Sequence, residues 1–148
     1  FETRFIALAG EINRKMPEFV REKAWRSLNR LGVAPSRSKV LALGVSYKAD
    51  LNDFRESPAI EVIKLLQADG AEVVYHDPHV PAFREHGVAM ESLPLTESLI
   101  KGCDLVLVLT AHKGVDHEWV TQHAKHVLDT RYATRKFWEK YPGKVTLL

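Results

Sequence analysis

The chain has little cysteine and no long apolar run. Cys103 is the single cysteine among 148 residues, which precludes an internal disulfide and leaves no thiol pair for a metal site. No apolar stretch approaches the roughly eighteen residues of a membrane-spanning helix, and the N-terminus lacks the basic-then-apolar layout of a signal peptide. We therefore expect a cytoplasmic protein with no membrane partner.

The chain also lacks a large excess of positive or negative charge. The chain has 21 lysines and arginines against 19 acidic residues, for a formal net charge of +2. The basic residues are spread along the chain without a dense cluster or interleaved aromatics, so we expect no nucleic-acid partner. A hydrophobic fraction of 45% is ordinary for a globular protein, and this length accommodates one domain plus an appendage.

Hydrophobic periodicity divides the chain near residue 35. From Glu2 to Arg30 apolar residues recur at helical spacing, which predicts one long helix, or two if Pro17 restarts it. Gly32 then stops the helical pattern, and residues 33–38 are a linker of turn formers.

Beyond that boundary, short apolar runs alternate with helical patterns, which is typical of βαβ units and a parallel sheet. Strands are predicted at 39–44, 72–77, 104–110 and 126–130. Helices are predicted at 57–70, 95–102 and 116–124, with a short helix and a final strand in the tail. The expected fold class is α/β, a doubly wound, mostly parallel open sheet (Rossmann-like) preceded by a long N-terminal helix. Ligands of such sheets bind outside the carboxyl ends of the strands.

The loop between the first strand and the first helix of this sheet lacks the glycine-rich fingerprint whose amides hold a pyrophosphate. It is long and polar and carries Lys48 and Arg55, so an anion there would be held mainly by side chains. Arg131, just past the fourth predicted strand, would lie at the same edge of the sheet. The alternative is that Lys48 and Arg55 are solvated loop charges. Asp50 and Asp53 could hold these cations in place or simply keep the loop soluble.

Asp77 ends the second predicted strand, where a dinucleotide-binding fold carries a ribose-binding acid. Without the glycine fingerprint we favour a turn, because Asp77-Pro78 is a natural turn start.

Several histidines fall close together late in the chain, next to an acid. They are His112, His117, His123 and His126, with Asp116. His117 and His123 are six residues apart and would lie on different faces of a helix, so we expect no metal site and interpret this group as surface histidines or as His112 near the ligand edge.

An ordered string of motifs spans residues 43–81, "LGVSYKADLNDFRESPAIEVIKLLQADGAEVVYHDPHVP". It resembles the C-terminal UDP-binding domain of the UDP-glucose/GDP-mannose dehydrogenase family, which uses NAD to oxidise the sugar C6 alcohol of nucleotide sugars to a carboxylate. The stretch "TRFIALAGEINRKMPEFV" is similar to the end of the family's central helical region, in the bacterial branch acting on UDP-N-acetyl-D-glucosamine or UDP-N-acetyl-D-mannosamine.

The resemblance implies roles for individual residues. Tyr47 and Lys48 would bind the UDP part of a UDP-sugar substrate, with Lys48 on phosphate, and Arg131 would contact the nucleotide sugar. Arg55 would reach NAD, which the family holds mainly with an N-terminal domain. The family's catalytic cysteine has no counterpart here, because Cys103 lies at the entry of a predicted strand, where a small apolar role is expected.

The resemblance also implies a domain organisation. Residues 1–34 would be the end of a central helical dimerisation region that forms a homodimer, and residues 35–148 a Rossmann-like UDP-sugar-binding domain. The chain is then expected to be an inactive fragment of an NAD-dependent UDP-sugar 6-dehydrogenase. Two alternatives remain open, namely a free-standing nucleotide sensor and a structural dimerisation module of the same fold.

Overall fold

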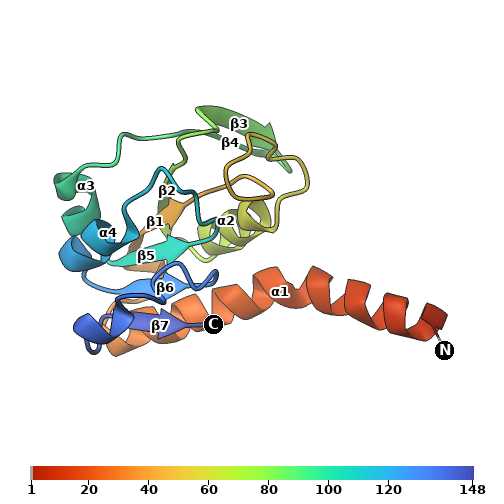
Figure 1. Cartoon of the computed structure of the whole chain (residues 1–148), viewed down its shortest axis with the longest axis horizontal. Coiled ribbons are helices and arrows are strands. Elements are labelled where there is room, and N and C mark those ends of the chain that lie inside the picture. Colours follow the sequence, from red (N-terminus) through yellow and green to blue (C-terminus); the bar gives the residue numbers. More distant parts are fainter. Residues whose placement is uncertain (1) are drawn as a thin grey trace.

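The computed structural model describes residues 2–148, with side chains from Lys15 onward. These residues form a five-stranded sheet covered by helices on both faces, a separate two-stranded hairpin, and one long N-terminal helix (Figure 1). The helices are α1 (Glu2–Arg30), α2 (Pro58–Ala68), α3 (Glu97–Gly102) and α4 (His117–His123), with 3₁₀ turns η1 (Pro35–Arg37) and η2 (Trp138–Lys140).

The sheet is parallel throughout, in the order β2-β1-β5-β6-β7. Its strands are β1 (Lys39–Leu43), β2 (Glu72–His76), β5 (Leu105–Val108), β6 (Val127–Asp129) and β7 (Val145–Leu147). The four predicted strands and the tail strand are thus confirmed, as is the fold class. The chain leaves β1 for β2 on one side and then crosses to β5 on the other, so the order reverses between β1 and β5.

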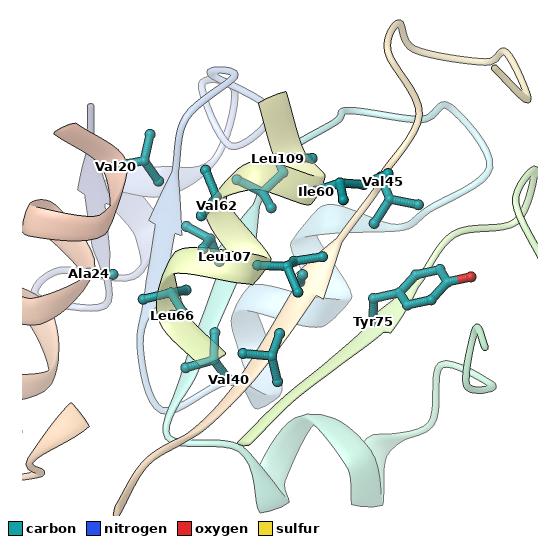
Figure 2. Packing of buried hydrophobic residues seen from close by; sticks show 14 of the residues in the cluster. Val20, Ala24, Val40, Val45, Ile60, Val62, Leu66, Tyr75, Leu107 and Leu109 are labelled. Carbon is teal, nitrogen blue, oxygen red and sulfur yellow. The ribbon is translucent and has the colours of Figure 1, made fainter. Parts of the chain in front are cut away.

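The central strands are apolar because both of their faces are buried. Along β1, Val40 and Ala42 pack into the core between the sheet and helices α1 and α2, whereas Leu41 and Leu43 pack into the second core, against α3 and α4. Figure 2 shows Val62 of α2 among the side chains of the first core. This two-sided burial explains why the strand sequences are continuous apolar runs rather than alternating ones.

Helix α1 runs without interruption through Pro17, so the prediction of one long helix holds and a restart does not occur. Its C-terminal half packs on the domain through Val20, Ala24 and Leu28. Its N-terminal half continues beyond the sheet domain, away from the strands (Figure 1). Residues 1–14, the first part of the apolar helical pattern predicted from the sequence, lie outside the residues whose side chains the structure describes.

Helix α1 is tied to the end of α2 by one carboxylate. The guanidinium of Arg21 donates through Nε and Nη2 to the two oxygens of Asp69, and Nε1 of Trp25 donates to Oδ2 of the same residue. Asp69 follows the last turn of α2, where the helix dipole disfavours a negative charge, so a cationic partner is needed there. The contact fixes where α1 lies across the domain.

Helix α2 begins as its sequence predicts. Ser57 caps it by accepting a hydrogen bond from the Ala59 amide at 3.3 Å, and Pro58 occupies the first helical position. After the helix, Gly70 adopts a φ of +93°, a conformation open mainly to glycine.

An antiparallel hairpin, β3 (Ala82–Glu85) with β4 (Val88–Glu91), was not predicted. The strands are joined by His86 and Gly87, both with positive φ, which is the two-residue turn that suits a hairpin twist. The sequence signal was the His-Gly pair, obscured by the charged residues Arg84 and Glu85 directly before the turn.

Candidate functional site

A cleft of about 430 Å³ opens at the carboxyl edge of the sheet, beneath α1. It brings together Tyr47, Lys48 and Arg131, three residues that sequence reasoning placed in one site. The rest of its lining comes mainly from apolar residues of α1, α2 and the strand ends. These residues are Met16, Pro17, Val20, Pro58, Ala59, Val62, Leu109, Thr130 and Leu148.

The close approach of β1 and β5 shapes this edge. Gly44, the residue after β1, has a φ of +84°, and a Cβ added to it would lie 2.5 Å from the Cβ of Thr110. Only glycine therefore fits where the chain leaves β1.

Lys48 is exposed, and its Nζ has no acidic partner in the part of the chain that the structure describes. Asp50, which sequence reasoning offered as a partner for the loop cations, instead accepts the Lys113 amide through Oδ1 at 2.8 Å. No acidic side chain is among the described residues that line the cleft, whose side chains begin at Lys15. The charge of Lys48 is therefore available to an anionic ligand.

Arg131 is held by its backbone and by one side-chain nitrogen. Its amide donates to Oδ1 of Asp129 at 3.0 Å, and its Nε donates to the carbonyl of Leu109 at 2.9 Å. Its two Nη atoms have no protein partner within residues 15–148. The side chain is thus oriented while its terminal nitrogens stay free to bind a ligand.

Asp129 organises the turn that carries Arg131. It is fully buried and also accepts hydrogen bonds from the amides of Ala133 and Thr134 and from the Thr134 hydroxyl, at 2.6 to 3.2 Å. A carboxylate buried without water requires such donors, and here the donors define the path of the chain after β6.

Arg55 lies apart from the cleft. Its side chain is 79% exposed, and its Nε donates to Oδ1 of Asp53 at 3.1 Å. That side-chain hydrogen bond, supported by the Arg55 amide, lowers the pKa of the Asp53 carboxyl. The pairing of the loop acid Asp53 with a loop cation is therefore observed, and the structure does not bring Arg55 to the other three predicted site residues.

A buried hydrogen-bond network behind the loop was missed by sequence reasoning. Oδ2 of Asp77 accepts from the amides of Val45 and Ser46, at 2.8 and 3.2 Å, and lies 2.9 Å from Nε2 of His112. Oδ1 accepts from the His79 amide at 2.8 Å, which confirms that Asp77 starts a turn. These contacts join residues distant in the sequence, so no local pattern announces them.

The group of possible metal ligands among the described side chains differs from the one weighed in the sequence. It consists of Asp50, His79 and His112, whose ligand atoms lie within 4.8 Å of one another. Nδ1 of His112 already accepts the Asp50 amide at 2.8 Å, so its lone pair is engaged by the protein itself. The group is therefore explained as part of the hydrogen-bond network.

Cys103 is buried at the amino end of β5, at the opposite edge of the sheet from the cleft. Its burial raises the pKa of the thiol to about 11. A thiol that holds its proton and lies away from the cleft has the packing role expected of it.

A doubly wound parallel sheet with a cleft at its carboxyl edge is the architecture of the nucleotide-binding class of α/β domains. The chain belongs to the UDP-glucose/GDP-mannose dehydrogenase family, whose UDP binding domain matches residues 41–136.

Curated relatives and solved structures support this assignment. The chain is 33% identical to the UDP-N-acetyl-D-mannosamine dehydrogenase of Methanococcus maripaludis, over 98% of this chain and 34% of that protein. The NDP-N-acetyl-D-galactosaminuronic acid dehydrogenase of Methanosarcina mazei superposes with a TM-score of 0.76 at 26% identity, over 96% of this chain and 30% of that one. The UDP-N-acetyl-mannosamine dehydrogenase of Staphylococcus aureus superposes with a TM-score of 0.69 at 29% identity, over 90% of this chain and 31% of that one.

The chain thus spans about a third of the length of the relatives that it matches. The part that it covers is the portion that carries the UDP binding domain.

Proposed function

We propose that this chain holds the UDP part of a UDP-sugar, as the substrate-binding portion of an NAD-dependent nucleotide-sugar 6-dehydrogenase. The observation that carries the proposal is the cleft, in which Lys48 and Arg131 lie beside an apolar wall and have no acidic partner among the side chains of residues 15–148. A nucleoside diphosphate suits such a cleft, because its phosphates are anionic and its base is flat and apolar on both faces.

Each cleft residue has a distinct part in this proposal. Lys48 supplies a mobile point charge to a phosphate, and the free Nη atoms of Arg131 donate to the nucleotide sugar in a planar fork. Tyr47 lies beside Lys48 and offers an aromatic face to the uridine. None of the residues of this chain is assigned a catalytic role.

A dinucleotide does not fit this sheet edge in the usual manner. The Val45 and Ser46 amides, which would face a pyrophosphate, already donate to Asp77, and the glycine fingerprint is lacking. We propose that NAD, the hydride acceptor, is bound mainly by another domain of the whole protein. Arg55, exposed and outside the cleft, then extends toward that domain, and the isolated chain is inactive as a dehydrogenase.

Helix α1 suggests how copies of the protein associate. We propose that residues 1–34 are the end of a helical dimerisation region and that residues 35–148 are the UDP-sugar-binding domain. Helix α1 extends beyond the sheet domain (Figure 1), and Phe19 on it is 45% exposed, which leaves a helix face available to a second copy. Light scattering should give twice the chain mass, reduced to one chain when residues 1–14 are removed; a monomer in both forms would contradict the homodimer.

Among the described residues, α1 is the longest helix, and neither it nor any other has an apolar stretch sufficient to cross a bilayer. We propose that the protein is located in the cytoplasm, because a single cysteine without a disulfide partner fits a reducing compartment.

Calorimetric titration of the chain with UDP, UDP-N-acetylglucosamine and NAD, each separately, tests the proposed function. Both UDP ligands should bind, and NAD alone should give no heat of binding. Lys48→Ala and Arg131→Ala should each weaken the affinity for UDP by about tenfold or more, since a hydrogen bond to a charged group is worth about 1.5 to 3 kcal/mol.

Lys64→Ala is the matched control, because Lys64 is an exposed cation on α2 that does not line the cleft. Its affinity for UDP should equal that of the unsubstituted chain. A folded chain that binds no UDP would contradict the proposal and favour the structural dimerisation module. Equal losses of UDP affinity in Lys64→Ala and Lys48→Ala would show that only the total positive charge of the chain matters, and not a contact in the cleft.

A further inference from the structure

We propose that His112 is a positioning residue, which holds the loop that presents Tyr47 and Lys48 to the nucleotide. The inference rests on the proposed function, because it concerns the same cleft. His112 does not line that cleft, and its side chain is 1% exposed, so it acts through the loop and not on the ligand.

The imidazole contacts the loop on both sides of Lys48. Its Nδ1 accepts the Asp50 amide at 2.8 Å, and its Nε2 lies 3.1 Å from Oγ of Ser46. Ser46 and Asp50 are each two residues from Lys48 in the sequence. One buried ring therefore spans the segment whose centre carries the cation.

Further bonds close the same segment. The Ser46 hydroxyl donates to the carbonyl of Lys48 at 2.8 Å, and the Tyr47 amide donates to the carbonyl of Asp53 at 2.6 Å. Asp50 adopts a φ of +62°, a conformation uncommon outside glycine, and this turns its amide toward the ring. The backbone at Asp50 accepts that strain while its N–H has His112 as an acceptor.

The geometry defines the tautomer of His112. An amide can donate only to a ring nitrogen with a free lone pair, so Nδ1 is unprotonated and the proton is on Nε2. Nε2 then donates to Oδ2 of Asp77 at 2.9 Å. The imidazole is neutral, with one nitrogen that accepts from the loop and one that donates to the core.

Asp77 holds the imidazole of His112 in place from the core side. Its side chain is fully buried, and its carboxylate accepts from the amides of Val45, Ser46 and His79 as well as from His112. These donors belong to the loop after β1, the turn after β2 and the loop after β5, so Asp77 joins the segments that follow three strands.

Holding the loop in one conformation raises the affinity for a nucleotide. A lysine on a loop with many conformers is competent to bind only in a fraction of them, and the apparent dissociation constant rises in proportion. His112 should therefore affect UDP binding without touching UDP.

Two conservative variants separate the two nitrogens of the ring. In His112→Asn the amide oxygen can take the place of Nδ1 and accept the Asp50 amide, whereas in His112→Gln the amide nitrogen can take the place of Nε2 and donate to Asp77. Calorimetry should show UDP affinity within about threefold of the unsubstituted chain for His112→Asn, and at least about tenfold weaker for His112→Gln. Equal affinities in the two variants would overturn the positioning role.

A measurement on the ligand-free chain keeps this inference separate from the proposed function. Backbone ¹⁵N relaxation should show residues 47–53 ordered in the unsubstituted chain and in His112→Asn, and mobile in His112→Gln. If the unsubstituted chain binds no UDP, the proposed function fails while this experiment still decides whether His112 orders the loop.

The unsubstituted chain offers a readout that needs no variant to fold. The Asp50 amide lies in an exposed loop, and its hydrogen exchange should nevertheless be slow because it donates to a buried nitrogen. Exchange as fast as that of the neighbouring Leu51 amide would overturn the inference.

Discussion

Nε of Arg131 donates to the carbonyl oxygen of Leu109 across the ends of β6 and β5. This bond uses one of the five N–H groups of the guanidinium for orientation and leaves the two Nη atoms for a ligand. The arginine thus reaches the cleft already oriented, which lowers the entropic cost of binding.

Arg131→Lys should therefore weaken UDP binding nearly as much as Arg131→Ala. A lysine has a single nitrogen, which cannot bond the Leu109 carbonyl and fork around a ligand together. We expect a loss of about tenfold by calorimetry, worth roughly 1.4 kcal/mol. Arg135→Lys, at an exposed arginine that does not line the cleft, is the control and should bind as the unsubstituted chain does. Full affinity in Arg131→Lys would mean that only the charge matters.

Gly44→Ala should be far more damaging than Gly87→Ala, although both glycines have positive φ. At Gly44 the new methyl group meets Thr110, whereas nothing lies within 4 Å at Gly87. Chemical denaturation should show that Gly44→Ala lowers the free energy of unfolding by about 3 kcal/mol or more and that Gly87→Ala lowers it by about 1 kcal/mol. Equal losses would show that backbone conformation alone, and not the approach of β1 to β5, requires glycine at position 44.

Asp69→Ala should loosen α1 from the domain. The change removes the partner of Arg21 and Trp25 together, and we expect unfolding to become easier by about 1.5 to 2 kcal/mol. Glu22→Ala breaks a solvent-exposed pair with Arg26 on the same helix and should cost less than about 0.5 kcal/mol. If denaturation gave the two variants the same stability, α1 would be held by its apolar contacts alone.

Cys103 should resist alkylation in the folded chain. With the pKa of its thiol raised to about 11 by burial, roughly one molecule in a thousand carries the thiolate at pH 8. Iodoacetamide should label the chain rapidly in guanidinium chloride and at least about a hundredfold more slowly without it, as followed by mass spectrometry. Comparable rates would show that the thiol is accessible in the folded state.

Much of the fold follows from the sequence because β1 and β5 are buried on both faces and therefore appear as uninterrupted apolar runs. The hairpin was missed because Arg84 and Glu85 mask its short strands, and its turn depends on a single Gly87. The prediction that Lys48 and Arg131 share one edge needed only parallel strands, since each residue follows the carboxyl end of one, and both residues line the cleft.

The network around His112 could not be predicted in the same way. It depends on distances among residues 46, 77 and 112 and on which ring nitrogen carries the proton, and neither is encoded in spacing along the chain. The pairing of Arg55 with Asp53 is local in the sequence, two residues apart, and for that reason it was foreseeable.

Helix α1 lines the cleft with part of its length and also continues beyond the sheet domain. Its segment before Lys15 spans roughly 20 Å at the rise of an α-helix, whereas the Arg21–Asp69 contact ties a later turn of α1 to the C-terminal end of α2. Pro17, which lines the cleft, lacks the N–H that would continue the helical hydrogen bonds, so the helix bends most easily there. Because Met16 and Pro17 line the cleft, a contact that bent α1 at Pro17 would move this side of the cleft.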